Sequence, residues 1–224
     1  MHKTERKIIM NHQAIKMDDK VIGIYDKDSN NLAYFHSDTP DSPFSNLYQP
    51  KNGFNLYAYN GKMQVAPAKG AKTYHFNSVE QVFAFGKALS MHDKESAKKI
   101  YQTNSYPAIY RKLGRSVKNF DPQVWQDAST QWMKLGMLAK FSQDPYCRKA
   151  LKATKGINLI EANPYDRIWG IGKNIHQDFG HYQAQNKQGQ TLMKVRQELG
   201  FDQGLRQKSQ IKGRNISDDS EFGD

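Results

Sequence analysis

The chain has one cysteine, Cys147, among 224 residues. A single cysteine cannot form an intrachain disulfide or a multi-cysteine metal site, so both are excluded. The seven histidines show no spacing typical of metal ligands, and we expect no metal and no other cofactor. The sequence also lacks a Walker A loop, a G-x-S-x-G elbow and a Cys–His signature, which argues against the enzymes that use them.

Long apolar runs are missing as well. The mean hydropathy is −0.83, and no segment reaches the roughly 20 apolar residues that a membrane-spanning helix needs. The short run Ile8–Met10 is too brief for the apolar region of a signal peptide. We therefore expect a cytoplasmic protein without a membrane partner.

Positive charge is in excess, with 33 Lys and Arg against 22 Asp and Glu and a formal net charge of +11. An excess of this size indicates an anionic substrate or a polyanionic partner, such as DNA or RNA bound through a basic surface. Good solubility alone is the competing explanation.

The distribution of polar and apolar residues predicts one domain with two polar ends. We expect a basic arm over residues 1–20, a domain over 21–200 and a disordered tail over 201–224. Periodicity and turn residues predict strands at 21–25, 32–35, 55–59, 63–66 and 158–162, with a flexible connection at 67–72. Helices are expected at 78–91, 93–103, 107–113, 122–142, 145–154 and 188–199.

The helix expected to begin at Ser78 carries the first candidate functional face. Ser78 and Gln81 have the spacing of a capping box. Glu80, Phe83 and Lys87 share one stripe of this helix, with Glu80 and Lys87 about 10 Å apart along the axis. This spacing suits two groups that grip one substrate. A solvated charged face is the alternative, and the aromatic ring between the charges argues against it.

A second candidate segment, Asp166-x-x-Trp169-Gly170-x-Gly172, combines an acid, an indole and two glycines. Glycine allows a backbone amide to approach a ligand closely, and an indole can stack on a flat base. Alternatively, Asp166 caps a turn and Trp169 belongs to the core.

Two further positions border these segments along the chain. Trp125 lies near the start of a helix and could edge a cleft, although a core position is the alternative. Arg115, with Arg111 and Lys112 nearby, could hold a phosphate, and an exposed basic turn is equally consistent with the composition.

Taken in order, these segments resemble the NADAR family, also called YbiA-like. The resemblance rests on Pro43–Leu47, Ser78–Ala88, Leu113–Arg115, Trp125 with Met133, Ala139–Phe141, Leu151–Gly156, Leu159–Ala162, Asp166–Gly172 and Leu192–Arg196. It spans roughly residues 32–199 and implies a single compact α+β domain, mainly helical, with a few short strands.

The resemblance also implies a function, the cleavage of N-glycosidic bonds. Family members hydrolyse phosphoribosylamino-pyrimidine intermediates of riboflavin synthesis, and others remove ADP-ribose from guanine in nucleic acid. By position, Glu80 matches the family's essential glutamate and Lys87 the lysine that follows it. Asp166 and Trp169 match the acid and indole of the closing motif.

We therefore expect Glu80, Lys87 and Asp166 to be catalytic, with Lys87 either attacking the anomeric carbon or binding phosphate. The residues expected to bind the substrate are Phe44, Asn46, Phe83, Arg115, Trp125, Trp169 and Gly170. The substrate would contain ADP-ribose or a phosphoribosyl group. The alternative from another class is a module that binds NAD or ADP-ribose without cutting it.

Overall fold

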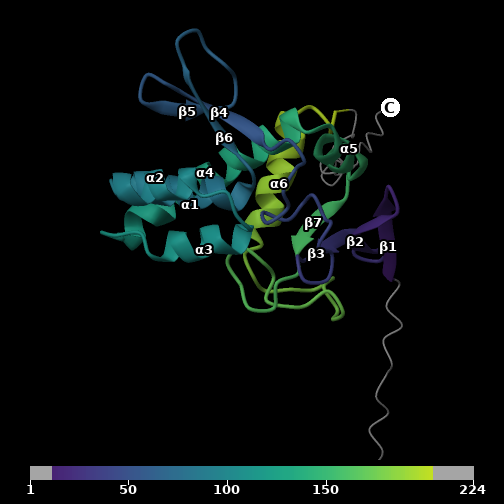
Figure 1. Ribbon diagram of the computed structural model, residues 1–224. Coiled ribbons are helices and arrows are strands. Elements are labelled where there is room, and N and C mark those ends of the chain that lie inside the picture. The colour runs from purple at the N-terminus through teal and green to yellow at the C-terminus, as the bar shows by residue number, and fades with distance from the viewer. Residues whose placement is uncertain (1–11, 204–224) are drawn as a thin grey trace, which may run out of the picture.

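The computed structural model describes residues 12–203 and shows, within that range, an α+β fold with two sheets and six helices (Figure 1). The strands are β1 (His12–Met17), β2 (Lys20–Asp26), β3 (Asn31–Tyr34), β4 (Phe54–Tyr59), β5 (Lys62–Gln64), β6 (Lys72–Phe76) and β7 (Asn158–Glu161). The helices are α1 (Val79–Ser90), α2 (Lys94–Gln102), α3 (Pro107–Arg115), α4 (Pro122–Gln143), α5 (Pro145–Ala153) and α6 (Lys187–Glu198). The predicted class is confirmed, although "mainly helical" understates the two sheets.

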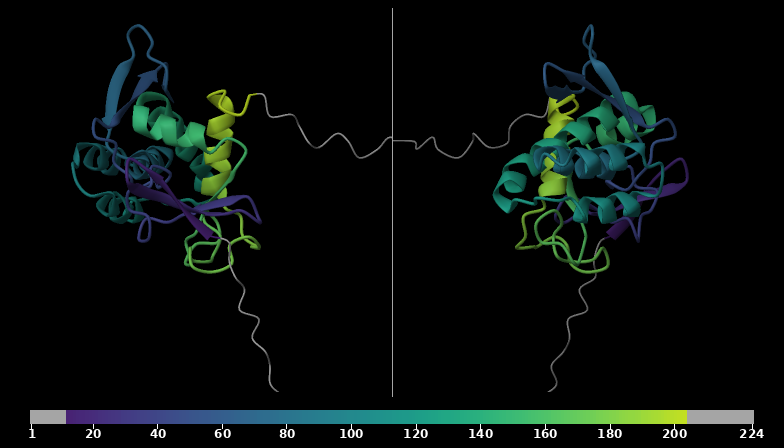
Figure 2. Two further views of the ribbon diagram at one scale, coloured as in Figure 1. Left: turned by 90° about the vertical axis from the view of Figure 1, so that its right-hand side faces the viewer. Right: turned by 60° about the vertical axis from the view of Figure 1, so that its left-hand side comes forward.

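The four-stranded sheet has the order β1-β2-β3-β7, and its last pair is parallel. Tyr34 at the end of β3 is paired with Glu161 at the end of β7. Because both strands end at one edge, the segments that follow them leave the sheet side by side. Figure 1 shows the loops after β7 gathered below this edge. The second sheet, β5-β4-β6, is antiparallel and projects from the helices (Figures 1 and 2).

The prediction of a basic arm over residues 1–20 is wrong from His12 onward, because His12–Met17 form β1. The strand pairs with β2 through a turn in which Asp18 and Asp19 both have positive φ. Two successive left-handed residues match the twist of a tight hairpin, and aspartate tolerates them better than most residues. Residues 1–11 lie outside the described residues.

Two other boundaries differ from expectation. The connection predicted at 67–72 ends one residue early, because Lys72–Phe76, where no strand was predicted, form β6. This edge strand pairs with β4, and its polar side chains hid its strand character. At the other end, Phe201 is 8% exposed and belongs to the core, so the expected tail cannot begin at 201. The remainder of that tail, from 204, lies outside the described residues.

Helix α1 is the centre of the helical layer and contacts α2, α3 and α4 (Figure 2). Its apolar residues Val79, Val82 and Phe85 are buried, as the periodicity predicts. A side chain at Gly86 would collide with the Trp132 ring of α4, so glycine permits the close approach of the two helices. The opposite face of α1 carries Glu80 and Phe83.

Side-chain caps fix where the helices begin. The Ser78 hydroxyl accepts the Gln81 N–H, and the Asp93 and Asp144 carboxylates accept the N–H groups of Ser96 and Cys147. The Ser78 cap holds Glu80 in the first turn of α1, beside the loop that follows β3. No helix within residues 12–203 is long and apolar enough to span a membrane.

Candidate active site

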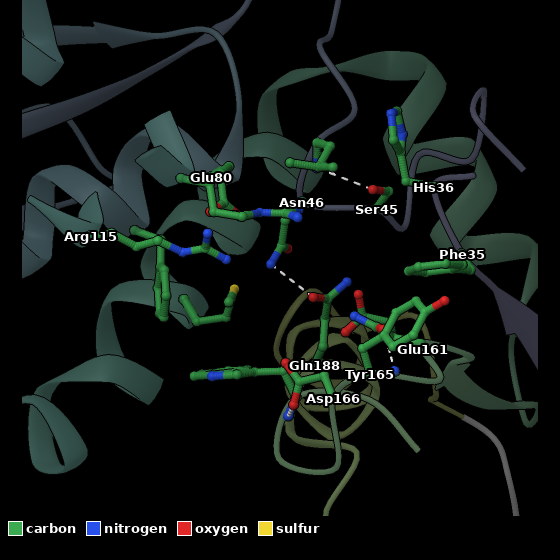
Figure 3. Close-up of a pocket in the computed structure, with 16 residues that line it drawn as sticks. Phe35, His36, Ser45, Asn46, Glu80, Arg115, Glu161, Tyr165, Asp166 and Gln188 are labelled. Carbon is green, nitrogen blue, oxygen red and sulfur yellow. Dashed lines mark hydrogen bonds and ion pairs between the residues drawn. The ribbon is translucent and has the colours of Figure 1, made fainter. Parts of the chain in front are cut away.

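A cavity of about 480 Å³ lies where the ends of β3 and β7 meet the helical layer. Its walls come from the β3–β4 loop, α1, α3, α4, the loop after β7 and the start of α6. The lining residues are Phe35, His36, Ser45, Asn46, Leu47, Glu80, Phe83, Arg111, Arg115, Met133, Glu161, Asn163, Tyr165, Asp166, Trp169 and Gln188. Figure 3 shows these side chains converging from both sides.

Glu80 lies in one wall, with a side chain that is only 12% exposed. Its backbone N–H donates to the Asn46 carbonyl at 3.1 Å, which ties α1 to the β3–β4 loop. Burial raises the pKa of Glu80, while the charges of Arg111 and Arg115 act in the opposite direction. Arg111 Nε lies 3.8 Å from Glu80 Oε1. Burial therefore favours the protonated form of Glu80, whereas the two arginines favour its ionised form.

Glu161 contributes a second carboxyl from the end of β7. Burial raises its pKa to about 8, and the nearby Asp166 and Glu80 carboxyls add to the shift while Arg111 opposes it. Two interacting carboxyls do not readily carry negative charge together, and Arg111, 3.8 Å from Glu80, favours the ionised form of Glu80 while Glu161 tends to keep its proton. The cavity thus holds both an acid and a base.

Asp166 and Trp169 form a turn on the opposite wall. Asp166 Oδ1 accepts the backbone N–H groups of Ile168 and Trp169, both at 2.8 Å. Asp166 therefore caps the turn, which was the alternative to a functional role, and it also lines the cavity. The carbonyls of residues 167–170 accept the N–H groups of residues 185–188, which attaches this turn to the start of α6.

Aromatic rings line the wall between these two sides. The Phe83 ring lies 5.3 Å from the Trp169 ring, nearly perpendicular to it, and 4.8 Å from the Trp125 ring. Trp125 does not line the cavity; it supports Phe83 from behind. Only Phe83 and Trp169 of this trio can touch a ligand directly.

Phe44 is not a stacking platform, contrary to expectation. The ring is fully buried between Tyr34 and Phe141 and does not line the cavity. The sequence placed Phe44 beside Asn46, but alternate residues of this loop point in different directions. Asn46, which is 7% exposed, lines the cavity as expected.

Lys87 also lies outside the lining residues. Its ammonium group sits 4.1 Å from the centre of the Phe120 ring, one helical turn beyond Phe83. Burial lowers its pKa. Gly170 does not line the cavity either. A side chain at this position would crowd Asn163 and the Glu161 carbonyl, so glycine is needed here for close packing within the turn.

Sequence reasoning missed three important members of the site. Glu161 and Gln188 were not predicted as site residues, and Arg111 was considered for phosphate binding beside Arg115 but was not among the expected site residues. A carboxylate directly after the apolar run Leu159–Ile160 was the available signal for Glu161. Gln188 offered none, because its role depends on contacts with residues more than 140 positions away.

A second cavity of about 590 Å³ lies within the loop after β7 and is lined by Arg167, Lys173 and His181 among others. The Lys173 ammonium donates to the Asp178 and His181 carbonyls, and Arg167 donates to the Gln183 carbonyl. These cations brace the loop. Residues 12–203 contain no group of three or more His, Cys, Asp or Glu that could hold a metal.

Comparison with known proteins finds several relatives of this chain. Protein irg-1 of Caenorhabditis elegans is 33% identical over 162 residues, which cover 70% of this chain and 74% of that protein. N-glycosidase R617 of Acanthamoeba polyphaga mimivirus is 35% identical over 133 residues, or 58% of this chain and 78% of its own length. N-glycosidase YbiA of Escherichia coli is 28% identical over 123 residues, covering 55% of this chain and 70% of YbiA.

The fold agrees with the NMR structure of E. coli YbiA, with a TM-score of 0.53 at 22% identity over 80% of this chain and 89% of YbiA. The family model described as NADAR domain matches residues 34–200. That span contains every residue that lines the first cavity. The chain therefore belongs to the NADAR family.

Proposed function

We propose that the protein is an N-glycosidase that hydrolyses the bond between a ribose and the nitrogen of a base or amine. The ribose would be part of ADP-ribose or of a phosphoribosyl group. The observation that carries this proposal is the pair of carboxyls with raised pKa, Glu80 and Glu161, in one cavity with Arg111 and Arg115. The names of R617 and YbiA support the reaction class.

Cleavage of the bond builds positive charge at the anomeric carbon and negative charge on the departing nitrogen. Glu161, with a pKa of about 8, holds a proton at neutral pH and donates it to the nitrogen. Glu80, with Arg111 beside it, supplies the carboxylate. It stabilises the anomeric carbon and takes a proton from the water whose oxygen bonds to that carbon. The products are the free base and the ribose with a new hydroxyl.

Five other lining residues have parts in this proposal. Arg111 and Arg115 bind phosphate, since guanidinium groups match phosphate oxygens. Trp169 and Phe83 contact the base. Asp166 uses Oδ1 for its own turn, which leaves Oδ2 for a ribose hydroxyl.

Two substrate classes fit these features: ADP-ribosylated guanine in DNA or RNA, and phosphoribosylamino-pyrimidines of riboflavin synthesis. The net charge of +11 favours the nucleic acid slightly. Release of a free base from either substrate, detected by mass spectrometry, tests the proposal. Tight ADP-ribose binding without release would favour the alternative, a non-catalytic NAD or ADP-ribose module.

Arg115→Ala should weaken ADP-ribose binding by about 10- to 100-fold, because a charge-assisted hydrogen bond contributes roughly 1.5–3 kcal/mol. Isothermal titration calorimetry measures this change. Lys112→Ala is the matched control, since Lys112 is exposed on the same helix and does not line the cavity. Equal weakening by both variants would indicate a diffuse charge effect and would contradict a phosphate site at Arg115.

Lys87 enters the proposal as a candidate nucleophile, because burial lowers its pKa. Its place over Phe120 favours a supporting role instead. We expect Lys87→Arg, which keeps the charge but cannot form a Schiff base, to retain activity within about 10-fold of wild type. Loss of all turnover in a folded Lys87→Arg variant, measured by base release, would assign the covalent role to Lys87.

A further inference from the structure

Gln188 connects the two walls of the cavity, one through its backbone and the other through its buried side chain. It lies in the first turn of α6 and is 2% exposed. Its backbone N–H donates to the Trp169 carbonyl at 3.0 Å, and its Oε1 accepts the Asn46 Nδ2–H at 2.8 Å. Figure 3 shows the Asn46 and Gln188 side chains pointing toward each other. No role for Gln188 follows from the reaction described above.

The polarity of this pair is fixed by the backbone. Gln188 Nε2 lies 3.4 Å from the Phe44 carbonyl oxygen, which can only accept a hydrogen bond. The amide nitrogen of Gln188 must therefore face Phe44, which turns Oε1 toward Asn46. Asn46 must in turn present Nδ2 to Gln188. Its Oδ1 is left buried without a hydrogen-bond partner among the described residues.

The backbone around Asn46 is held by other groups. The Lys140 ammonium, fully buried, donates to the carbonyls of Pro43 at 2.7 Å and Ser45 at 3.0 Å. The Glu80 N–H holds the Asn46 carbonyl. Because these contacts do not involve Gln188, a change at Gln188 should release the Asn46 side chain while the loop stays in place.

We propose that Gln188 is a positioning residue that orients Asn46 so that Asn46 Oδ1 accepts a hydrogen bond from the ligand. The ligand group would be a ribose hydroxyl or an N–H of the base. A buried acceptor without a partner is costly, and a donor from the ligand relieves that cost. An ionised phosphate oxygen cannot do so, so phosphate belongs at the arginines. The identity of the ligand rests on the proposed function; the orientation of Asn46 does not.

Gln188→Glu tests the orientation through pH. An ionised glutamate has no donor for the Phe44 carbonyl and its oxygen is repelled there, so the carboxylate should turn away from Phe44 and no longer hold Asn46 in place. A protonated glutamate donates to Phe44 and still accepts from Asn46. We expect the ADP-ribose affinity of Gln188→Glu, as a ratio to wild type at the same pH, to fall at least 10-fold at pH 8. It should recover to within about 3-fold at pH 5.

The ratio cancels titration that wild type and variant share. The groups concerned are Tyr34, whose hydroxyl lies 3.4 Å from Gln188 Nε2, and Glu80 and Glu161, which line the same cavity. Gln190→Glu, exposed on the same helix, is the matched control and should give a ratio near one at both pH values. A ratio for Gln188→Glu that does not change with pH would overturn the positioning role.

A ligand-free measurement separates this inference from the proposed function. In NMR spectra at pH 8, Gln188→Glu should shift the Asn46 side-chain amide signals and leave the Glu80 amide protected from exchange. Unchanged Asn46 signals would overturn the inference even if ADP-ribose binds. If wild type binds no ADP-ribose, the proposed function fails while the NMR result still decides the orientation.

Two small probes test the class of ligand group. Ribose 5-phosphate carries hydroxyl donors, whereas inorganic phosphate at pH 8 offers mainly acceptors. Gln188→Glu should weaken binding of ribose 5-phosphate at least 5-fold and leave inorganic phosphate unchanged in NMR titrations at pH 8. Equal weakening of both would contradict a donor contact at Asn46.

Discussion

Glu80→Gln should lower kcat for base release by about 10³-fold, because the amide can neither stabilise the anomeric carbon by charge nor accept a proton from water. The backbone N–H of residue 80 still holds the Asn46 carbonyl, so the cavity should keep its shape. We therefore expect ADP-ribose affinity to change less than 10-fold. Single-turnover kinetics and calorimetry on the same protein measure the two quantities.

The control for this variant is Glu95→Gln on α2, where the side chain is 88% exposed and pairs with Lys118. It should have wild-type activity. A Glu80→Gln variant with more than a tenth of wild-type kcat would remove Glu80 from the chemistry and leave it a structural acid that pairs with Arg111.

Glu161→Gln should lower kcat by about 10²-fold at pH 7 and change the shape of the pH profile. Wild-type activity should decline as pH rises through about 8, where Glu161 loses its proton. An amide has no proton to lose there, so the residual activity of Glu161→Gln should show no such decline. A decline near pH 8 that persists in the variant would assign it to another group.

The pH dependence of the unfolding free energy reports independently on the protonation of Glu161. Between pH 4.5 and about 8 the folded state keeps a proton on Glu161 that the unfolded chain releases. Wild-type stability should therefore fall as pH rises through this window. Relative to wild type, Glu161→Gln should gain at least about 1 kcal/mol in unfolding free energy on going from pH 4.5 to 8.5, measured by chemical denaturation.

Local chemistry made much of the fold predictable. Ser78, Asp93 and Asp144 stand at helix starts because their side chains cap free N–H groups, and the structure confirms all three caps. Helix boundaries agree with the periodicity to within about two residues. Strands β1 and β6 were not predicted, because an edge strand with polar side chains depends on its partner strand rather than on its own sequence pattern.

The site was predictable only where a helix or a turn carries it. Glu80 and Phe83 share a helical face, and Asp166 and Trp169 share one turn, so spacing alone places each pair. The prediction that Phe44 binds the substrate was wrong, because the sequence of a loop does not show which side chains point into the cavity. Lys87 was expected in the cavity because it shares the face of Glu80, yet one further turn carries it to Phe120.

Glu161 and Gln188 depend on contacts that no local pattern encodes. Glu161 reaches the cavity because β7 pairs with β3 in parallel, across more than 120 residues of sequence. Gln188 reaches it because α6 begins on the carbonyls of the Trp169 turn. Both positions follow from how the sheet and the helices meet, and this arrangement creates the acid–base pair.

The most direct test of the account is hydrolysis in H₂¹⁸O. Wild type and Glu80→Gln would each be given phosphoribosylamino-pyrimidine and, separately, ADP-ribosylated guanine DNA, with products identified by mass spectrometry. We predict that wild type releases the free base from at least one substrate and places oxygen-18 on the released sugar, while Glu80→Gln does neither. Binding of ADP-ribose with no release of base from either substrate would contradict the account and indicate a binding module.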